Sequence, residues 1–275
     1  MFTLLPTPIG NLDDLSYRVV QSLKEANVIL CEDTRVTKRL LYLLKDKYNF
    51  QTQFEQCIAL HSHNEDQFLE KITPIFFEQN VVYMSDAGMP AISDPGAKLV
   101  KYCQINNIQY DVIPGANALI TAYSASGFED TAFSFYGFLP HKGKDRDNLL
   151  QTVINSSINV VLYESPHRLL KLLDSLSKLI PNRDIFLAKE LSKKYQTYFY
   201  GASSYLYQQL KNQTIKGEWV VVIKKTQNSS KTCLSEQDII NENLSLKSTS
   251  KLIAKITGEN PKAVYQKILK EQKIE

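Results

Sequence analysis

Glycine is scarce in this sequence, with 10 residues among 275. A globular domain usually contains about 7% glycine. The chain has no G-x-G-x-x-G motif after its first apolar run and no G-x-x-x-x-G-K-S/T motif at any position. These motifs bring glycine backbone close to the phosphates of dinucleotides and nucleoside triphosphates. Their absence argues against a common dinucleotide-binding fold and against a P-loop NTPase.

Long apolar runs, a signal peptide and closely spaced cysteines are also missing. No run of about 18 apolar residues is present, so we expect no membrane span. The first residues, MFTLLPTPIGN, lack a basic segment followed by an apolar one, so we expect no signal peptide. None of the four cysteines belongs to a CxxC pair, which favours free thiols in the cytoplasm. The net charge of +3 is compatible with nucleic acid without requiring it.

Short apolar runs alternate with amphipathic segments in the first part of the chain. Buried parallel strands joined by helical crossovers produce this pattern. We therefore predict a doubly wound α/β domain with a mainly parallel sheet at residues 1–117. Its expected strands are Phe2–Leu5, Val28–Cys31, Ile58–Leu60, Val81–Met84 and Gln109–Ile113. Its expected helices are Leu15–Ala26, Thr34–Leu44, Asn64–Gln79 and Ala97–Ile105.

A second α/β domain is predicted at residues 118–225. Its third and fourth strands are too close in sequence for a helix between them, so they should pair antiparallel and make this sheet mixed. The expected strands are Phe133–Phe138, Val160–Tyr163, Ile185–Ala188, Tyr195–Tyr200 and Trp219–Ile223. The expected helices are Arg146–Ile154, Pro166–Leu179 and Ser203–Lys211.

The polar, lysine-rich tail, residues 226–275, is predicted to be a linker and a small helical domain. Three short helices are expected in it. Gly258 should end one helix, and Asn260-Pro261 should start the next. Such helices could bind a partner, or they could serve packing or dimerisation alone.

Proline and glycine gather in three loops that follow predicted strands. The loops are PTPIGN (6–11), SDAGMPAISDPG (85–96) and PGANA (114–118). Proline fixes the backbone and glycine lets it approach a ligand closely, although each loop alone could be an ordinary tight turn. Ligands of open α/β sheets bind beyond the carboxyl ends of the strands. Together the loops predict a rigid ligand cradle there.

Charged and titratable side chains follow two other strands of the first domain. In CEDTRVTKRLL (31–41), helix capping accounts for Glu32 and Asp33. Capping does not account for Arg35, since a positive charge near a helix N-terminus is unfavourable. His61 and His63 would need a third ligand to hold a metal. We therefore expect hydrogen-bonding histidines and no metal.

The second domain carries three segments of similar character. In LYESPHRLL (162–170), Ser165 and Pro166 suit a helix start. That leaves other side chains free for a ligand, namely Glu164, His167 and Arg168. The charge run AKELSKKYQ (188–196) is either a solvated face or part of a site. The basic segment FLPHKGKDR (138–146) is either an exposed loop or a contact to phosphates.

Nine motifs, taken in order, resemble the bacterial ribosomal RNA small-subunit methyltransferase I family of the tetrapyrrole methylase superfamily. The resemblance covers residue 2 to about 225, and the tail resembles the family's small helical C-terminal domain. It implies two α/β domains with S-adenosylmethionine in the cleft between them, and homodimers. It also implies methyl transfer to the ribose 2′-hydroxyl of a cytidine in 16S ribosomal RNA of the small subunit. The motifs are PTPIGNLDD, CEDTR, HSHNE, SDAGMPAISDPG, PGANALITAYSASG, GFLPHKG, LYESPHRLL, KELSKKY and KGEWVVVI.

The resemblance also implies which residues touch the cofactor. The chain departs from the family at Met89, where threonine is usual, and at Ala91, where glycine is usual. PGANA stands where Pro-Gly-Pro-Ser-Ala is usual. The implied cofactor-binding residues are Thr7, Pro8, Ile9, Asp86, Gly88, Met89, Ile92, Ser93, Asp94, Pro114, Gly115, Ala116, Tyr163, Gly217 and Glu218.

Methyl transfer to a ribose hydroxyl needs alignment of the attacking oxygen and removal of its proton. Asp33 and Glu190 are the candidate bases. The candidates for orienting phosphates or lowering the hydroxyl pKa are Arg35, Arg168 and Lys189. Besides the helical tail, the side chains predicted to contact the substrate are His61, His63, His141, Lys142, Lys144, Arg146 and His167. Two alternatives stay open: a corrinoid C-methyltransferase and a non-catalytic ribosome-assembly factor.

Overall fold

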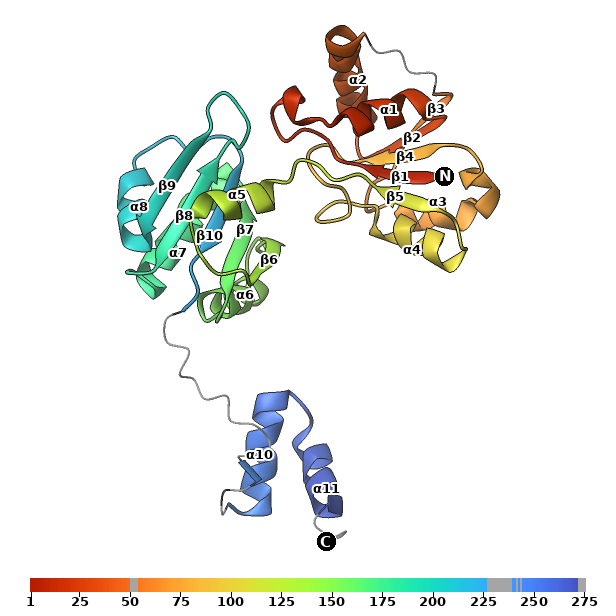
Figure 1. The fold of residues 1–275 in the computed structure, drawn as a ribbon. Coiled ribbons are helices and arrows are strands. Elements are labelled where there is room, and N and C mark those ends of the chain that lie inside the picture. Colours follow the sequence, from red (N-terminus) through yellow and green to blue (C-terminus); the bar gives the residue numbers. More distant parts are fainter. Residues whose placement is uncertain (50–53, 227–238, 241, 243, 272–275) are drawn as a thin grey trace. The chain divides into compact units, whose positions relative to one another are not determined.

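The computed structural model describes residues 1–49, 54–226, 239–240, 242 and 244–271. The chain divides into two compact units, Met1–Thr226 and Gln227–Glu275. The first unit contains two five-stranded sheets, one parallel and one mixed, and the second contains helices (Figure 1). The predicted fold class is therefore confirmed. The predicted boundary at residue 117 falls inside the first unit and stays a prediction.

The first sheet is parallel throughout, in the order β3-β2-β4-β1-β5. Its strands are β1 (Phe2–Leu5), β2 (Val28–Cys31), β3 (Gln56–Ala59), β4 (Val81–Met84) and β5 (Tyr110–Val112). Every residue of β1, β2 and β4 is buried, which explains their unbroken run of mainly apolar residues. Because β4 lies between β1 and β2, the loops that follow these three strands leave the sheet side by side.

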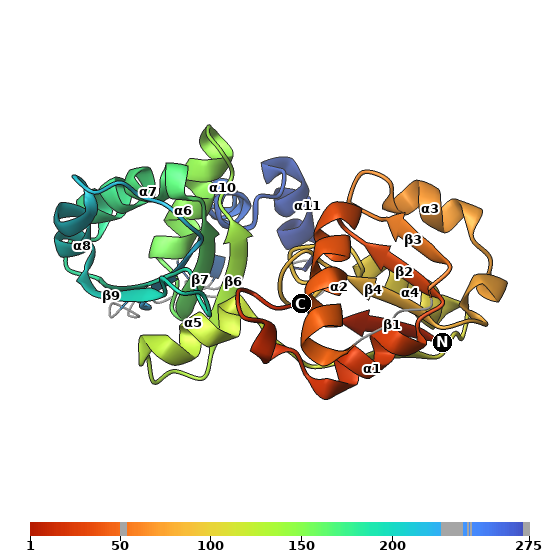
Figure 2. The same cartoon turned by 90° about the horizontal axis from the view of Figure 1, so that it is seen from above.

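Helices cover both faces of the first sheet (Figures 1 and 2). Leu5, Ile29 and Met84 belong to the core under α1 (Tyr17–Glu25) and α2 (Thr34–Tyr48). The intervening strand residues, such as Leu4 and Tyr83, belong to the core under α3 (Glu65–Lys71) and α4 (Ala97–Ile105). This alternation follows from the two-residue period of a strand.

The predicted helix Asn64–Gln79 was wrong in its extent. α3 ends at Lys71, and a separate 3₁₀ helix, η2, spans Pro74–Phe77. Pro74 lacks a backbone N–H and restricts the residue before it to extended conformations, so it cannot continue α3.

The second sheet is mixed, in the order β6-β7-β10-β8-β9. Its strands are β6 (Phe133–Phe138), β7 (Asn159–Glu164), β8 (Asp184–Lys189), β9 (Thr197–Ala202) and β10 (Trp219–Ile223). β6 and β7 pair in parallel, and the other pairs are antiparallel. The predicted antiparallel pairing of the two strands between residues 185 and 200 is confirmed.

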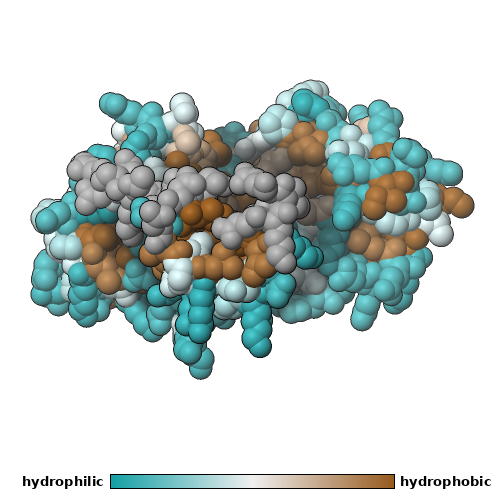
Figure 3. All heavy atoms as spheres, turned by 90° about the horizontal axis from the view of Figure 1, so that it is seen from below, coloured by the Kyte–Doolittle hydropathy of each residue, from teal (hydrophilic) through white to brown (hydrophobic). Residues whose placement is uncertain are grey.

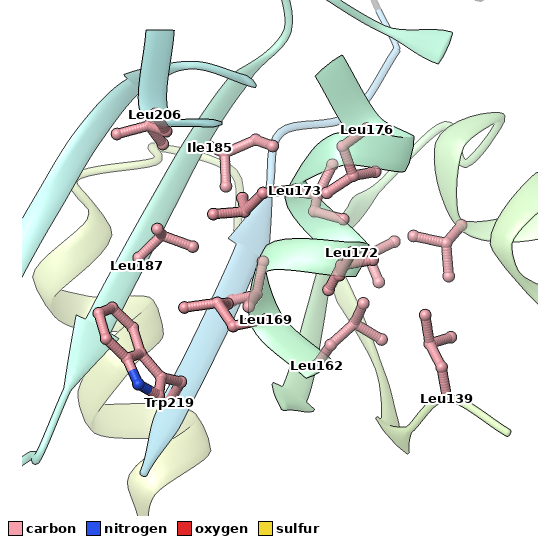
Figure 4. Packing of buried hydrophobic residues seen from close by; sticks show 14 of the residues in the cluster. Leu139, Leu162, Leu169, Leu172, Leu173, Leu176, Ile185, Leu187, Leu206 and Trp219 are labelled. Carbon is pink, nitrogen blue, oxygen red and sulfur yellow. The ribbon is translucent and has the colours of Figure 1, made fainter. Parts of the chain in front are cut away.

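Four helices complete the two layers of the second sheet. α6 (Lys144–Ile154), α7 (Pro166–Leu179) and α8 (Ser203–Leu210) bury one face, and α5 (Ala118–Ser126) packs on the other. Leu169 of α7 points toward Leu187 of β8 and Trp219 of β10, and Leu172 lies nearer to Leu162 and Leu139 (Figure 4). This core holds rigid the strand ends that border the site described below.

The helical unit contains α10 (Leu246–Thr257) and α11 (Pro261–Glu271) around a small apolar core. Gly258, with a φ of +76°, ends α10, and α11 starts at Pro261, as predicted. Most of the predicted linker, and most of the first predicted tail helix, lie outside the described residues. No helix in the described ranges is both long and apolar enough to cross a bilayer. On the face that Figure 3 shows, hydrophilic and hydrophobic residues are intermixed.

Candidate active site

A cavity of about 440 Å³ lies in the first unit, with walls from both sheets. The first sheet supplies the loops that follow β1, β2 and β4, together with the start of α5. The second sheet supplies the ends of β7 and β8 and the start of β10. The volume falls in the range of small-molecule sites. The lining includes Ile9, Glu32, Asp86, Met89, Ile92, Asp94, Phe138, Tyr163, Glu164, Leu191 and Val220.

The loops after β1 and β4 are joined by a two-residue bridge. The Thr7 N–H donates to the Gly88 carbonyl at 2.9 Å, and the Gly88 N–H donates to the Thr7 carbonyl at 3.1 Å. The buried Thr7 hydroxyl donates to the Ser85 carbonyl at 3.2 Å. Gly88 has a φ of +85°, and a Cβ there would lie 3.2 Å from Cγ2 of Ile9. Conformation and space therefore both favour glycine at this wall of the cavity.

Ala91 occupies a strained position in the same loop. Its φ is +64°, and its N–H donates to the Pro95 carbonyl at 3.2 Å. The left-handed region costs a residue with a Cβ about 1–2 kcal/mol. Glycine avoids that cost but loses about 0.5–1 kcal/mol through the entropy of the unfolded chain.

We therefore expect Ala91→Gly to raise the free energy of unfolding by about 0.5 kcal/mol, as the balance of these two costs. Urea unfolding followed by circular dichroism measures the change. Ala97→Gly, in the first turn of α4, is the control and should lower the free energy of unfolding. A decrease for Ala91→Gly as large as that for the control would show that the loop is not strained.

Three of the five acidic residues that line the cavity come from the loops of the first sheet: Glu32, Asp86 and Asp94. Burial raises the pKa of each, and the negative charge of another member raises it further. The Asp86 N–H donates to Glu32 at 3.5 Å, and the Asp33 N–H donates to Asp86 at 3.1 Å. Behind them, the buried hydroxyl of Tyr83 has no hydrogen-bond partner among the described residues. Such a set favours a ligand that brings positive charge.

The rest of the lining is mainly apolar. Ile9, Met89 and Ile92 contribute from the first sheet's loops, and Leu191 and Val220 contribute from the second. Ile92 and Phe138 are 51% and 55% exposed, so the mouth of the cavity has apolar edges. The cavity thus suits a ligand that is cationic in one part and apolar in another.

A buried ion cluster supports the side of the cavity next to β7. The Glu164 carboxylate, fully buried, lies 3.2 Å from Nε of Arg168 and 4.0 Å from Nη1 of Arg146. The two guanidinium groups also donate to the Pro140 carbonyl, at 3.4 Å from Arg168 and 3.3 Å from Arg146. Arg168 donates to the Leu139 carbonyl at 2.5 Å as well. The cluster therefore anchors the start of the loop that carries His141.

Comparison with known proteins identifies the family. The family model of tetrapyrrole (corrin/porphyrin) methylases matches residues 1–216. A ribosomal RNA small subunit methyltransferase I from Campylobacter fetus subsp. fetus is 46% identical, over 98% of this chain and 100% of the relative. One from Helicobacter pylori (strain ATCC 700392 / 26695) is 43% identical, over 99% of each. The chain belongs to the ribosomal RNA small subunit methyltransferase I family, within the tetrapyrrole methylases.

Two solved structures share the fold. The uroporphyrin-III-C-methyltransferase of Thermus thermophilus matches with a TM-score of 0.54 over 80% of this chain and 93% of that one. The methyltransferase CobJ matches with a TM-score of 0.57 over 82% of this chain and 94% of that one. Both are 15% identical to this chain, so they support the fold alone. The predicted family is confirmed by the relatives from Campylobacter fetus and Helicobacter pylori.

Most residues that the family resemblance assigned to the cofactor do line the cavity. Those in the lining are Ile9, Asp86, Gly88, Met89, Ile92, Ser93, Asp94, Tyr163 and Glu218. Those outside it are Thr7, Pro8, Pro114, Gly115, Ala116 and Gly217. Several of the second group shape the walls instead. A Cβ on Gly115 would lie 2.3 Å from Pro6, and one on Gly217 would lie 2.6 Å from Glu190.

The two predicted bases do not line the cavity. Asp33 caps α2 and binds Arg35 at 2.6 Å, and these hydrogen bonds lower its pKa to about 2. Glu190 accepts from the Glu218 N–H at 2.8 Å and from Lys193 at 3.0 Å. Burial raises the pKa of Glu190, but these two hydrogen bonds lower it more, so the pKa lies below its usual value. Both carboxylates therefore have low proton affinity, and their hydrogen bonds stabilise the local structure.

The predicted cations and histidines are spread around the cavity. Lys189 lies over the Trp219 ring, 5.7 Å from its centroid. Arg146 and Arg168 are in the ion cluster, with Arg146 only 3% exposed.

The predicted substrate contacts that are exposed are His63, His141, Lys142, Lys144 and His167. His61 is half-buried, and its Nδ1 has no hydrogen-bond partner within the described ranges. No group of three metal-ligating side chains occurs among the described residues.

The sequence analysis missed Glu32 as a cavity residue, and it left Glu164 free for a ligand without assigning it a role. Glu32 had been explained as part of a helix start, yet α2 begins two residues later and leaves its side chain in the cavity. Both follow or end buried strands, Glu32 after β2 and Glu164 at the end of β7. A carboxylate at the carboxyl end of a buried strand was the available signal.

Proposed function

We propose that this chain transfers a methyl group from S-adenosylmethionine to the ribose 2′-hydroxyl of a cytidine in 16S ribosomal RNA of the small subunit. The observation that carries the proposal is the 46% identity over 98% of the chain to a ribosomal RNA small subunit methyltransferase I. The carboxylate-lined cavity supports it independently, because its chemistry suits this cofactor. We place the activity in the cytoplasm, where the substrate subunit resides.

The cavity residues fit S-adenosylmethionine. The cofactor has a sulfonium, an ammonium and a flat adenine, which match the carboxylates and the apolar walls described above. Asp86 and Asp94 would attract the positive charges, and Ile9, Met89 and Val220 would contact the apolar parts. When bound, the cofactor supplies a methyl group that is already activated for displacement. No glycine-rich dinucleotide motif is needed, since carboxylates and a bridged loop form this site.

The residue that we propose as proton acceptor is Glu32. Its side chain lines the cavity, and burial, followed by the charge of Asp94, raises its pKa. A base with a raised pKa holds a proton better than Asp33 or Glu190, whose pKa values are lowered. Glu32 would take the proton of the ribose hydroxyl as that oxygen attacks. The ion cluster at Glu164 would keep the facing loop in place.

The exposed basic residues near the cavity suit contact with RNA phosphates. Lys142 lies in the loop that the ion cluster anchors, and Lys144 begins α6 directly after that loop. Arg146, which was predicted with them, is buried and supports this loop from below. We also propose that the helical unit contacts the subunit and that the chain acts as a homodimer.

One assay tests the proposed function. Small subunits from a strain that lacks the enzyme are incubated with S-adenosylmethionine labelled in its methyl group, and the modified nucleotide is mapped. We expect label on a ribose oxygen of a cytidine in 16S ribosomal RNA. A porphyrin precursor serves as the competing substrate, because the matching family model is that of tetrapyrrole methylases and one structure with this fold is a uroporphyrin-III-C-methyltransferase. Label on the porphyrin, or on neither substrate, would refute the proposal.

A further inference from the structure

The helix α2 concentrates the positive charge of this chain. It contains five basic residues and one acidic residue, a net charge of +4, whereas the whole chain has a net charge of +3. The rest of the chain is therefore slightly negative. The basic residues are Arg35, Lys38, Arg39, Lys45 and Lys47.

Four of the five basic residues lie on one exposed side of the helix, and the fifth, Lys47, pairs with Asp13. Thr37, Leu41 and Leu44 are buried against the first sheet. At 100° per residue, Arg39 and Tyr42 lie opposite that buried side. Arg35 and the acidic Asp46 lie on the same outer side, and Lys38 and Lys45 lie along one edge of it. Tyr42 is 65% exposed at the centre of this surface. We call Arg35, Lys38, Arg39, Tyr42 and Lys45 the α2 stripe.

The charges of the α2 stripe are largely unpaired. Lys38, Arg39 and Lys45 form no ion pair or side-chain hydrogen bond with any described residue. Arg35 bonds to Asp33, yet its side chain is 89% exposed. Single exposed lysines on other helices either pair, as Lys98 does with Asp66, or stand alone, as Lys101 does, whereas α2 has three unpaired cations within eight residues. Asp46 is the one acidic residue on this outer face, against four basic residues. A solvated helix face usually mixes both signs more evenly.

The position of the stripe connects it to the cavity. Glu32 lines the cavity, Asp33 caps α2, and Arg35 lies in the first helical turn. From Arg35 to Lys45 the stripe extends for about 15 Å at 1.5 Å per residue. Figure 2 views the first sheet from the side of α1 and α2, and α2 lies toward the viewer. A strand that places one nucleotide in the cavity could continue along this helix.

We propose that the α2 stripe is a docking surface for the RNA strand next to the methylated nucleotide. The proposal rests on the proposed function, because it assumes that a ribose must reach the cavity. Lysine and arginine would neutralise phosphates, and the exposed Tyr42 ring would stack on a base. The helix start places a positive charge, Arg35, where the helix dipole disfavours it, as expected of a residue kept for binding. An acidic protein could also use the charges and the ring, and the crosslink described below tests that occupant against RNA.

The first test neutralises the unpaired cations. The triple variant K38Q/R39Q/K45Q keeps helix-forming side chains, so α2 should fold normally. We expect its affinity for small subunits from a strain that lacks the enzyme to fall about tenfold or more, and the slope of log affinity against log salt to decrease by about 2. Affinity for S-adenosylmethionine should stay unchanged. The control K101Q/K171Q/K211Q removes three exposed lysines elsewhere and should change neither quantity.

The second test examines the aromatic ring and identifies the partner. Tyr42→Ala should raise the KM for subunits about tenfold, whereas Tyr42→Phe keeps the ring and should stay near wild type. A photoreactive phenylalanine at position 42 should crosslink to 16S ribosomal RNA near the methylated nucleotide. A crosslink to a ribosomal protein alone would overturn the assignment of RNA as the occupant.

These tests separate the two proposals. If wild-type enzyme labels the RNA and the α2 variants match it in KM and salt dependence, the docking surface is wrong and the methyltransferase function stands. If wild-type enzyme labels no RNA, the proposed function fails first and the docking surface fails with it. Thermal unfolding of each variant shows whether the α2 substitutions left the fold intact.

Discussion

Glu32→Gln is expected to lower the turnover number by about 10²–10⁴-fold, the usual contribution of a general base. The amide keeps the size of the side chain and can still accept from the Asp86 N–H, but it cannot take a proton. S-adenosylmethionine should still bind, because Asp86 and Asp94 remain in the cavity. Single-turnover kinetics measures the methyl-transfer step, and calorimetry measures the cofactor affinity.

The pH dependence gives a second readout of the same assignment. Only the ionised carboxylate accepts a proton, so wild-type turnover should rise with pH through the pKa of Glu32 and then level off. Burial raises the pKa of Glu32 above that of an ordinary glutamate. The increase in turnover should therefore occur at a higher pH than for an ordinary glutamate. The Glu32→Gln variant should lack this limb.

The two bases predicted from sequence serve as controls. Asp33→Asn retains a capping side chain, and Glu190→Gln retains an acceptor for the Glu218 N–H. Neither group lines the cavity, so each variant should lose less than about tenfold in turnover, well below the contribution of a general base. Wild-type turnover in Glu32→Gln, with a large loss in either control, would transfer the role of base to that control residue.

Glu164→Gln should lower the free energy of unfolding by about 3–5 kcal/mol, the cost of leaving a buried charge without its partner. The buried guanidinium of Arg146 and the partly buried one of Arg168 would lose the carboxylate between them. The loop at Pro140 would lose its anchor, so the KM for subunits should rise as well. Urea unfolding measures the stability, and methylation kinetics measures the KM.

An exposed ion pair on α7, the helix that also carries Arg168, provides the matched control. Asp174 pairs with Lys178 at 2.6 Å, but the two side chains are 33% and 70% exposed. Asp174→Asn should cost less than about 1 kcal/mol, since exposed pairs contribute little. The double variant Glu164→Gln/Arg168→Gln should differ in free energy of unfolding from the sum of the two single variants, which measures the coupling between residues 164 and 168. If Glu164→Gln costs no more than the surface control, the cluster does not support the site.

The fold was predictable because short-range patterns dictate it. The residues of β1, β2 and β4 are buried on both faces, and such strands are mainly apolar along their whole length. The short gap between β8 and β9 forced an antiparallel pair. The extent of α3 was the failure, because the apolar residues continue past the proline that ends it. The family was predictable from nine motifs in order, and relatives over nearly the full chain confirm it.

The individual roles at the site were harder to predict, because they depend on contacts across long stretches of sequence. Asp33 has the residue type of a base, but its partner Arg35 lowers its pKa. Arg146 has the residue type of a phosphate contact, but Glu164 and Pro140 hold it in the interior. Residue type and spacing do not reveal burial, and burial sets both the charge state and the reach of a side chain.

The sequence by itself determined the fold class, the family and the loops that form the site, since strand periodicity, proline and glycine act locally. Only the tertiary structure placed Glu32 inside the cavity and Asp33 outside it. These two residues are neighbours in the chain, yet their side chains diverge as β2 gives way to α2. Proton affinity follows from that divergence, because burial and neighbouring charge raise one pKa while a salt bridge lowers the other.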